Sequence, residues 1–228
     1  MSLLTATIAC GAGQPDPEEQ AEFLRRSRAE HGPPNDEALA WREVGGFSFD
    51  DAAELERMRP IEGIWRIDGG ELIAESGAPD RNRTLLIMPL QGDHLRIAFD
   101  VTLEARPDGR VGDICVRIAD AETGSFREHY AAITSQYWNQ ASVVYRRNIP
   151  IARTEWSPVV PGRTHRVLLE FSRGRRRDHL RYWVDGKVVI DGWHPPDSMD
   201  LTGTWIGIST YDTRLRIANL TIHVGEPR

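Results

Sequence analysis

Residues 113–147 gather acidic, aromatic and amide side chains more densely than any other part of the sequence. Two carboxylic acids, Asp113 and Glu128, lie in this stretch, and a pair of carboxyl groups can act as general acid and general base. Aromatic and hydrogen-bonding side chains surround them, which is the mixture that a ligand pocket needs. We therefore predict Asp113 and Glu128 as catalytic residues, and as substrate-binding residues Arg117, Tyr130, Trp138, Asn139, Gln140, Tyr145 and Arg147.

Strand alternation selects the first of these side chains, because successive residues of a strand point to opposite faces of a sheet. The run GDICVRIAD places Ile114, Val116 and Ile118 on one face, so Asp113 and Arg117 belong to the other. In the next strand-like run, EHYAAITS, we expect Ala131 and Ile133 to face the core, which directs Glu128 and Tyr130 to the ligand face.

The same pattern also fits a site without a ligand. A solvated sheet face that carries cross-strand ion pairs, such as Asp113 with Arg117 or Arg147, would alternate in the same way. Paired carboxylates on strands are also common as partners of salt bridges. The sequence leaves both interpretations open.

The elements that position these residues are strands and turns. In LRYWVDGKVVIDGW, the dipeptide Asp185-Gly186 is typical of a two-residue type I′ turn, in which both central residues need a positive φ. Alternating apolar residues on both sides predict a hairpin. The run HLRIAFDVTLEA alternates from Leu95 to Leu103 and predicts a long strand. The last strand-like run changes parity near Ala218-Asn219, as a β-bulge would.

Strands at this spacing, without alternating helices, predict an all-β sandwich or jelly roll. We expect one such domain over residues 41–228, preceded by an extension, residues 1–40, that holds one helix. In that helix, DPEEQAEFLRRSRAEHG, the acids come early and the arginines late, which suits the helix dipole. A second short helix is expected after Asp50.

Composition excludes several classes of function. The net charge of -6 argues against nucleic-acid binding, and no apolar run is long enough to span a membrane. Cys10 and Cys115 have no zinc-binding spacing, so we expect two free thiols. The sequence has no calcium-loop signature either, so we assign no metal ligands and no other cofactor. The start, MSLLTATIACGAG, lacks the positive region of a signal peptide, which favours a cytoplasmic location over secretion or lipid anchoring. The oligomeric state is not indicated.

Three motifs together resemble a known superfamily: GIWRIDGGELIAES, HLRYWVDGKVVID and GTWIGISTYDTRLRIANLTIH. Their order is similar to that in concanavalin A-like lectins and glucanases, and most similar to bacterial putative 3-keto-disaccharide hydrolases and related sugar-processing jelly rolls. The matched residues include Tyr182, Val184, Lys187 and Asn219, and the likeness covers roughly residues 41–225. It implies a concanavalin A-like jelly roll that binds ligands across its concave sheet.

The resemblance implies a carbohydrate-active protein, with a glycoside-hydrolase-like enzyme acting on an oligosaccharide or polysaccharide as the preferred interpretation. The Glu-x-Asp-x-x-Glu motif of the retaining glucanases is not found in the sequence, so laminarinase-type activity is not expected. A noncatalytic carbohydrate-binding module and a structural sandwich domain are the alternatives.

Overall fold

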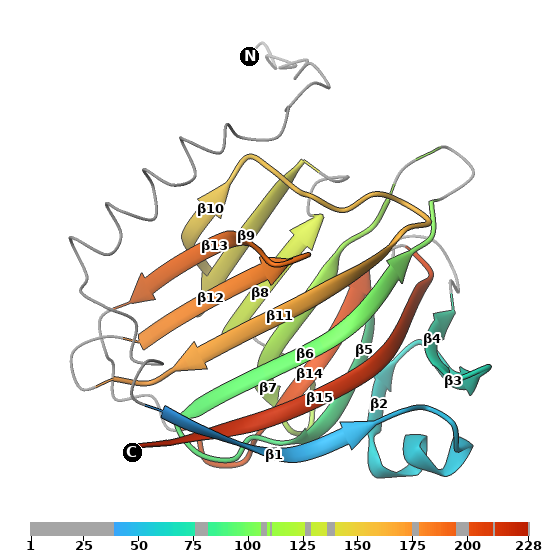
Figure 1. Ribbon diagram of the computed structural model, residues 1–228, viewed down its shortest axis with the longest axis horizontal. Coiled ribbons are helices and arrows are strands. Elements are labelled where there is room, and N and C mark those ends of the chain that lie inside the picture. Colours follow the sequence, from blue (N-terminus) through green and yellow to red (C-terminus); the bar gives the residue numbers. More distant parts are fainter. Residues whose placement is uncertain are drawn as a thin grey trace, which may run out of the picture.

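The fold is a sandwich of two antiparallel sheets (Figure 1). The computed structural model describes residues 39–75, 82–105, 109, 111–125, 129–135, 140–174, 178–194, 201–211 and 213–227. The helix expected in the extension lies outside these residues. The short helix expected after Asp50 is a 3-10 helix, η2 (Ala52–Arg57), whose first turn is capped by the Asp51 carboxylate.

The eight-stranded sheet begins at β13 at one edge and ends at β3 at the other, with β1 added alongside β15. Its strands, in spatial order, are β13 (Lys187–His194), β12 (Asp178–Val184), β11 (Thr164–Ser172), β6 (His94–Leu103), β15 (Leu215–Pro227), β4 (Glu71–Glu75) and β3 (Ile64–Asp68), together with β1 (Leu39–Phe47).

The seven-stranded sheet lies behind it in Figure 1. Its strands, in spatial order, are β10 (Ile149–Thr154), β9 (Ala141–Arg146), β8 (Tyr130–Ser135), β7 (Ile114–Asp120), β14 (Thr204–Tyr211), β5 (Asn82–Pro89) and β2 (Arg59–Glu62). Neighbouring strands often come from distant parts of the chain; β14, for example, lies between β7 and β5. Among the described residues, no helix is long and apolar enough to cross a membrane.

The core between the sheets follows the predicted alternation. All five alternating apolar residues of β6, from Leu95 to Leu103, are buried in it. The parity change in the last strand is a bulge, because the register with β6 shifts between Ala218 and Thr221 and Asn219 has a φ of 51°. The Asn219 amide donates to the Asp100 carboxylate at 2.6 Å. The bulge lets the apolar residues on both sides of it face the same core.

The predicted hairpin joins β12 to β13. Asp185 and Gly186 have φ values of 50° and 74°, as a type I′ turn requires. The Asp185 carboxylate accepts the backbone N–H of Arg166 at 2.9 Å and lies 2.8 Å from Nδ1 of His165. These contacts tie the turn to β11, so Asp185 stabilises the sheet as well as the turn.

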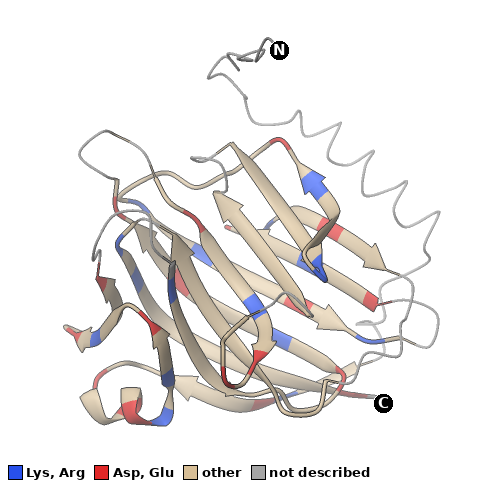
Figure 2. Cartoon of the chain, turned by 180° about the vertical axis from the view of Figure 1, so that it is seen from behind, with Lys and Arg blue, Asp and Glu red and all other residues tan. Residues whose placement is uncertain are grey.

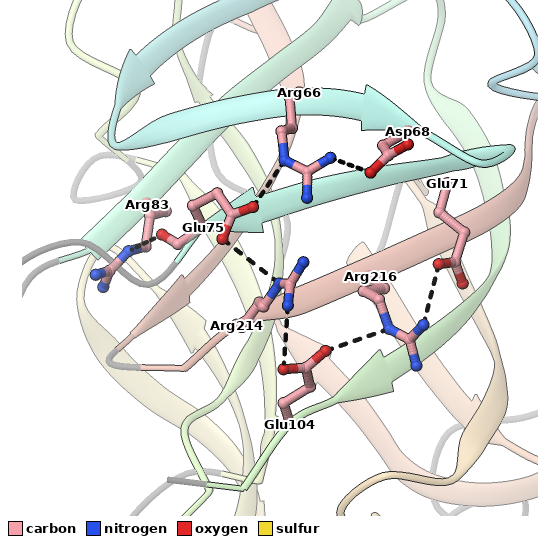
Figure 3. Close-up of polar contacts among 8 residues, drawn as sticks. All are labelled: Arg66, Asp68, Glu71, Glu75, Arg83, Glu104, Arg214 and Arg216. Carbon is pink, nitrogen blue, oxygen red and sulfur yellow. Dashed lines mark hydrogen bonds and ion pairs between the residues drawn. The ribbon is translucent and has the colours of Figure 1, made fainter.

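An ionic network crosses the outer face of the eight-stranded sheet near β3 and β4 (Figure 3). Glu75 is one of its centres: it accepts from Arg66 Nε at 2.7 Å and pairs with Arg214 at 3.5 Å. Glu104 is the other, pairing with Arg214 at 3.6 Å and with Arg216 at 3.5 Å. The network joins the β3–β4 hairpin to β15 and to Glu104, the residue after β6, and its remaining members are Asp68 and Glu71.

Candidate functional site

A cleft of about 900 Å³ lies on the outer face of the seven-stranded sheet. This volume falls within the range of roughly 300–1,000 Å³ that is typical of ligand pockets. Charged residues on this side of the molecule are scattered and do not form one patch (Figure 2). The described residues that line the cleft are Ile61, Glu62, Thr84, Asp113, Cys115, Arg117, Thr123, Gly124, Ser125, Ile133, Asn148, Ser209 and Tyr211.

Strand β7 and the residue before it supply the middle of the cleft floor. Ile114 and Val116 point into the core, so Asp113, Cys115 and Arg117 point outward into the cleft. This is the orientation that the alternation of GDICVRIAD predicts. The structure thus brings two of the predicted site residues, Asp113 and Arg117, into one cleft.

Neighbouring strands extend this floor on both sides. Thr84 of β5 pairs with Ser209 of β14, Ser209 pairs with Cys115, and Cys115 pairs with Ile133 of β8. The four residues form a row across the sheet, and Glu62 of β2 continues it beyond Thr84. The floor therefore carries hydroxyl groups on one side of Cys115 and an apolar side chain on the other.

Asp113 has the electrostatic environment of a proton-exchanging group. Burial raises the pKa of its carboxyl group to about 7, although the backbone N–H of Tyr211 and the charge of Arg117 both act to lower that pKa. Tyr211 donates this N–H to Oδ1 of Asp113 at 2.9 Å. A carboxyl group whose pKa lies near neutrality can both donate and accept a proton at the operating pH.

Arg117 acts as a support for the cleft wall. It is almost fully buried, donates from one guanidinium nitrogen to the carbonyl of Gly124 at 3.0 Å, and donates from the other to the Ser209 hydroxyl. The guanidinium therefore joins β7, β14 and the turn after β7. This turn forms one wall of the cleft.

The wall itself is held in place at two further points. The Asp120 carboxylate accepts the backbone N–H groups of Glu122 and Thr123 at 2.9 and 2.8 Å. Gly124 has a φ of 65°, and a Cβ there would lie 2.9 Å from Cγ2 of Thr84. The turn packs so closely on β5 that only glycine fits at this position.

Cys115 does not have the environment of a nucleophile. Its side chain is buried, and burial raises the pKa of the thiol, so it stays protonated at neutral pH. It is a free cysteine, as the sequence predicts. Cys10 lies outside the described residues. Among the described residues, no group of three His, Cys, Asp or Glu side chains is placed to hold a metal ion.

The predicted orientation of β8 is wrong. Tyr130 points into the core, where it is 1% exposed, packs 5.1 Å from the ring of Phe171 and donates to the Asp178 carboxylate at 2.5 Å. Ala131 and Ile133, expected in the core, pack with Cys115 on the cleft side instead. The residues of β8 are buried on both faces of the sheet, so the hydrophobic pattern does not indicate which of its side chains face the core. Tyr130 is therefore not a cleft residue.

The other predicted site residues lie on the cleft side of the sheet, in turns, or outside the described residues. Tyr145 is half-buried and packs on the cleft side of the sheet against Ala131 and Ile133. Arg147 lies in the turn after β9, not on a strand, and Gln140 is half-buried in the turn before β9. Glu128, Trp138 and Asn139 lie outside the described residues.

Sequence reasoning did not identify several residues that line the cleft. Glu62, Thr84, Ser209 and Tyr211 come from strands far from β7 in sequence, and only strand pairing brings them to the cleft. Asn148 had a local signal, because it follows Arg147 between two strand-like runs, as the second residue of a two-residue turn would.

No family model matches the chain, and no curated protein matches it. Solved structures do. A Bacillus subtilis protein of unknown function with a galectin-like fold aligns with a TM-score of 0.63 at 11% identity, over 83% of this chain and 100% of that one. The Emp46p carbohydrate recognition domain aligns with a TM-score of 0.58 at 10% identity, over 80% and 98%. The alginate lyase Aly36B, in complex with an alginate trisaccharide, aligns with a TM-score of 0.53 at 12% identity, over 81% and 98%. The chain therefore has a jelly-roll fold like that of the galectin-like protein.

Proposed function

We propose that this jelly roll is a carbohydrate-active protein that binds an oligosaccharide in the cleft on its seven-stranded sheet. The cleft is large enough for such a ligand, and its lining mixes hydroxyl, carboxyl and amide groups with apolar surface. The similarity to a carbohydrate recognition domain and to an alginate lyase that holds a trisaccharide supports this proposal. The sequence motifs that resemble sugar-processing hydrolases point in the same direction.

Asp113 is the residue that carries the enzymatic part of the proposal. Its carboxyl group lies at the cleft floor with a pKa of about 7, so it would exchange a proton with a bound sugar at neutral pH. In the proposed reaction, the protonated carboxyl donates its proton to the glycosidic oxygen as the bond to the sugar carbon breaks. A water molecule that loses a proton to a base then completes hydrolysis.

In this proposal, Glu128 supplies the second carboxyl group of the acid pair. Besides Asp113, the acid that lines the described part of the cleft is Glu62. It is three cross-strand steps from Cys115, which corresponds to a backbone separation of about 14 Å. The carboxyl groups of glycosidases lie about 5–9.5 Å apart. Because this backbone separation is longer than that spacing, the proposal assigns the second carboxyl group to Glu128 and not to Glu62. Binding without catalysis is the second candidate function.

The two candidates are separated by a product screen. The purified protein is incubated with neutral, acidic and oxidised oligosaccharides, and product masses are followed by mass spectrometry while ligand-dependent changes in Tm are recorded. An enzyme gives a new product mass that Asp113→Asn and Glu128→Gln abolish and that the distant Asp93→Asn leaves unchanged. A binding module gives a Tm shift without a product, and the shift is lost in Trp138→Ala. If the protein gives neither a new product nor a Tm shift with any sugar, both candidates are contradicted.

A further inference from the structure

In the described part of the chain, three hairpins have two-residue turns in which both residues have a positive φ. The turn between β3 and β4 is Gly69-Gly70, with φ values of 61° and 78°, and the turn between β12 and β13 is Asp185-Gly186. The turn between β9 and β10 is Arg147-Asn148, with φ values of 49° and 60°. It is the one of these three that contains no glycine.

Left-handed backbone is costly for residues other than glycine, and Asn and Asp tolerate it better than the rest. The type I′ turn therefore favours glycine at its second position, as the other two turns have. The β9–β10 turn instead holds an asparagine there, although a glycine would relieve strain. Non-glycine residues in such conformations cluster at ligand sites, where the surrounding structure maintains them.

The position of this turn supports a ligand role. Asn148 lines the cleft, whereas neither Gly69-Gly70 nor Asp185-Gly186 does. The Asn148 side chain is exposed and makes no hydrogen bond with any residue of the described part of the chain. Its carboxamide thus presents two N–H donors and a carbonyl acceptor to the cleft. Neighbouring hydroxyl groups on a sugar ring need such a combination of donors and acceptors.

Strand geometry separates Asn148 widely from Asp113 within the cleft. Asp113 precedes β7, and Arg117 lies four residues further along, which is about 13 Å at the rise of a strand. The β9–β10 turn lies beyond this point, because Arg147 donates its backbone N–H to the carbonyl of His129, just before β8 begins at the far end of β7. A single sugar ring is too short to contact both residues.

We propose that Asn148 binds the hydroxyl groups of a distal sugar unit and so selects ligands longer than a monosaccharide. This inference rests on the proposed oligosaccharide-binding function. In this view, the ligand crosses the sheet diagonally, with one unit at Asp113 before β7 and another at the β9–β10 turn, two strands away. The strained turn holds the Asn148 carboxamide at the cleft edge, at a cost to stability that a glycine would avoid.

The test compares Asn148→Gly with the natural chain. The probes are two length series, alginate di- to tetrasaccharides and neutral manno-oligosaccharides of the same lengths, each with its monosaccharide, and binding is measured by calorimetry. We expect affinity for the tetrasaccharide to fall about tenfold, the equivalent of one to two hydrogen bonds, while monosaccharide affinity stays the same. Because glycine suits the left-handed turn, Tm is expected to hold or to rise by about 2 °C.

Gly70→Asn is the matched control, since it places the same side chain in the same kind of turn on the other sheet. A Cβ at Gly70 has room, with its nearest neighbour 3.8 Å away. This variant is expected to bind every probe like the natural chain. If the natural chain binds the probes and Asn148→Gly binds the tetrasaccharide equally well, this inference is wrong and the proposed function stands. If the natural chain binds no probe, both fail.

Discussion

The backbone N–H of Tyr211 donates to the carboxylate of Asp113 at 2.9 Å, which joins the end of β14 to the start of β7 at the cleft floor. The two residues are 98 positions apart in sequence. This hydrogen bond orients the carboxyl group. It lowers the pKa of Asp113 by less than burial raises it, so the pKa remains raised to about 7. The carboxyl group proposed for catalysis is thus positioned by the backbone of another strand.

The first prediction concerns the pH dependence of stability. Because the folded state raises the pKa of Asp113 from 3.8 to about 7, it binds this proton more tightly than the unfolded state does. The contribution of Asp113 to stability is therefore complete below pH 4 and is lost as pH rises towards 7. Asp113→Asn removes this loss and keeps an acceptor for the Tyr211 N–H. Relative to the natural chain, the variant should gain about 1–3 kcal/mol between pH 4 and pH 8.

Urea denaturation of both proteins at pH 4, 6 and 8 measures this gain. The difference between the two proteins is the relevant quantity, because other carboxylates such as Asp120 and Asp191 have lowered pKa values and act in the opposite direction. A difference in unfolding free energy that does not change with pH would show that Asp113 titrates normally.

The second prediction concerns the cleft wall. Arg117→Met removes the hydrogen bonds to Gly124 and Ser209 while it keeps most of the apolar stem of the side chain. Since these are buried hydrogen bonds from a charged group, we expect the free energy of unfolding to fall by about 2–4 kcal/mol. Arg42→Met, which breaks only an exposed pair with Glu226, should cost less than about 1 kcal/mol. Equal costs for the two variants would contradict the supporting role of Arg117.

The third prediction follows from the corrected position of Tyr130. Tyr130→Phe keeps the ring contact with Phe171 but removes a donor from the buried Asp178 carboxylate. We expect a loss of about 1–3 kcal/mol in the free energy of unfolding. Oligosaccharide affinity should not change at a temperature at which the variant is fully folded. An affinity loss there would show that Tyr130 contacts the ligand after all.

The fourth prediction concerns the ionic network in Figure 3. Glu75→Gln removes the charge that pairs with Arg66 and Arg214. These side chains are about one third exposed, so solvent screens them, and we expect only a small fall in the free energy of unfolding. The cost should shrink between 0.1 and 1 M NaCl, where the Debye length falls from about 10 Å to about 3 Å. A salt-independent cost would indicate that Glu75 stabilises the sheet by hydrogen bonding alone.

Local patterns were sufficient where one face of a strand is apolar and the other is polar. The alternation of β6 correctly predicted its core face, Asp185-Gly186 correctly predicted a type I′ turn, and the parity change near Asn219 correctly predicted the bulge. For β7, the apolar set containing Ile114 and Val116 correctly left Asp113 and Arg117 to the opposite face.

The pattern failed on β8, where both faces are covered. Tyr130 and Ile133 are each buried, one in the core and one beside Cys115, so their hydrophobicity does not distinguish the two faces. The pairing of Cys115 with Ile133 decides the orientation, because directly paired residues share a face of the sheet. That pairing depends on how β7 and β8 are aligned, and the alternation of either strand by itself does not fix it.

The sequence by itself determined that this chain forms an all-β sandwich and that Asp113 and Arg117 share a face, because both follow from local periodicity and turn chemistry. Only the tertiary structure decided which residues complete the cleft. Glu62, Ser209 and Asn148 reach it through strand order and register. The raised pKa of Asp113 likewise depends on burial, which arises only when distant strands pack around the carboxyl group.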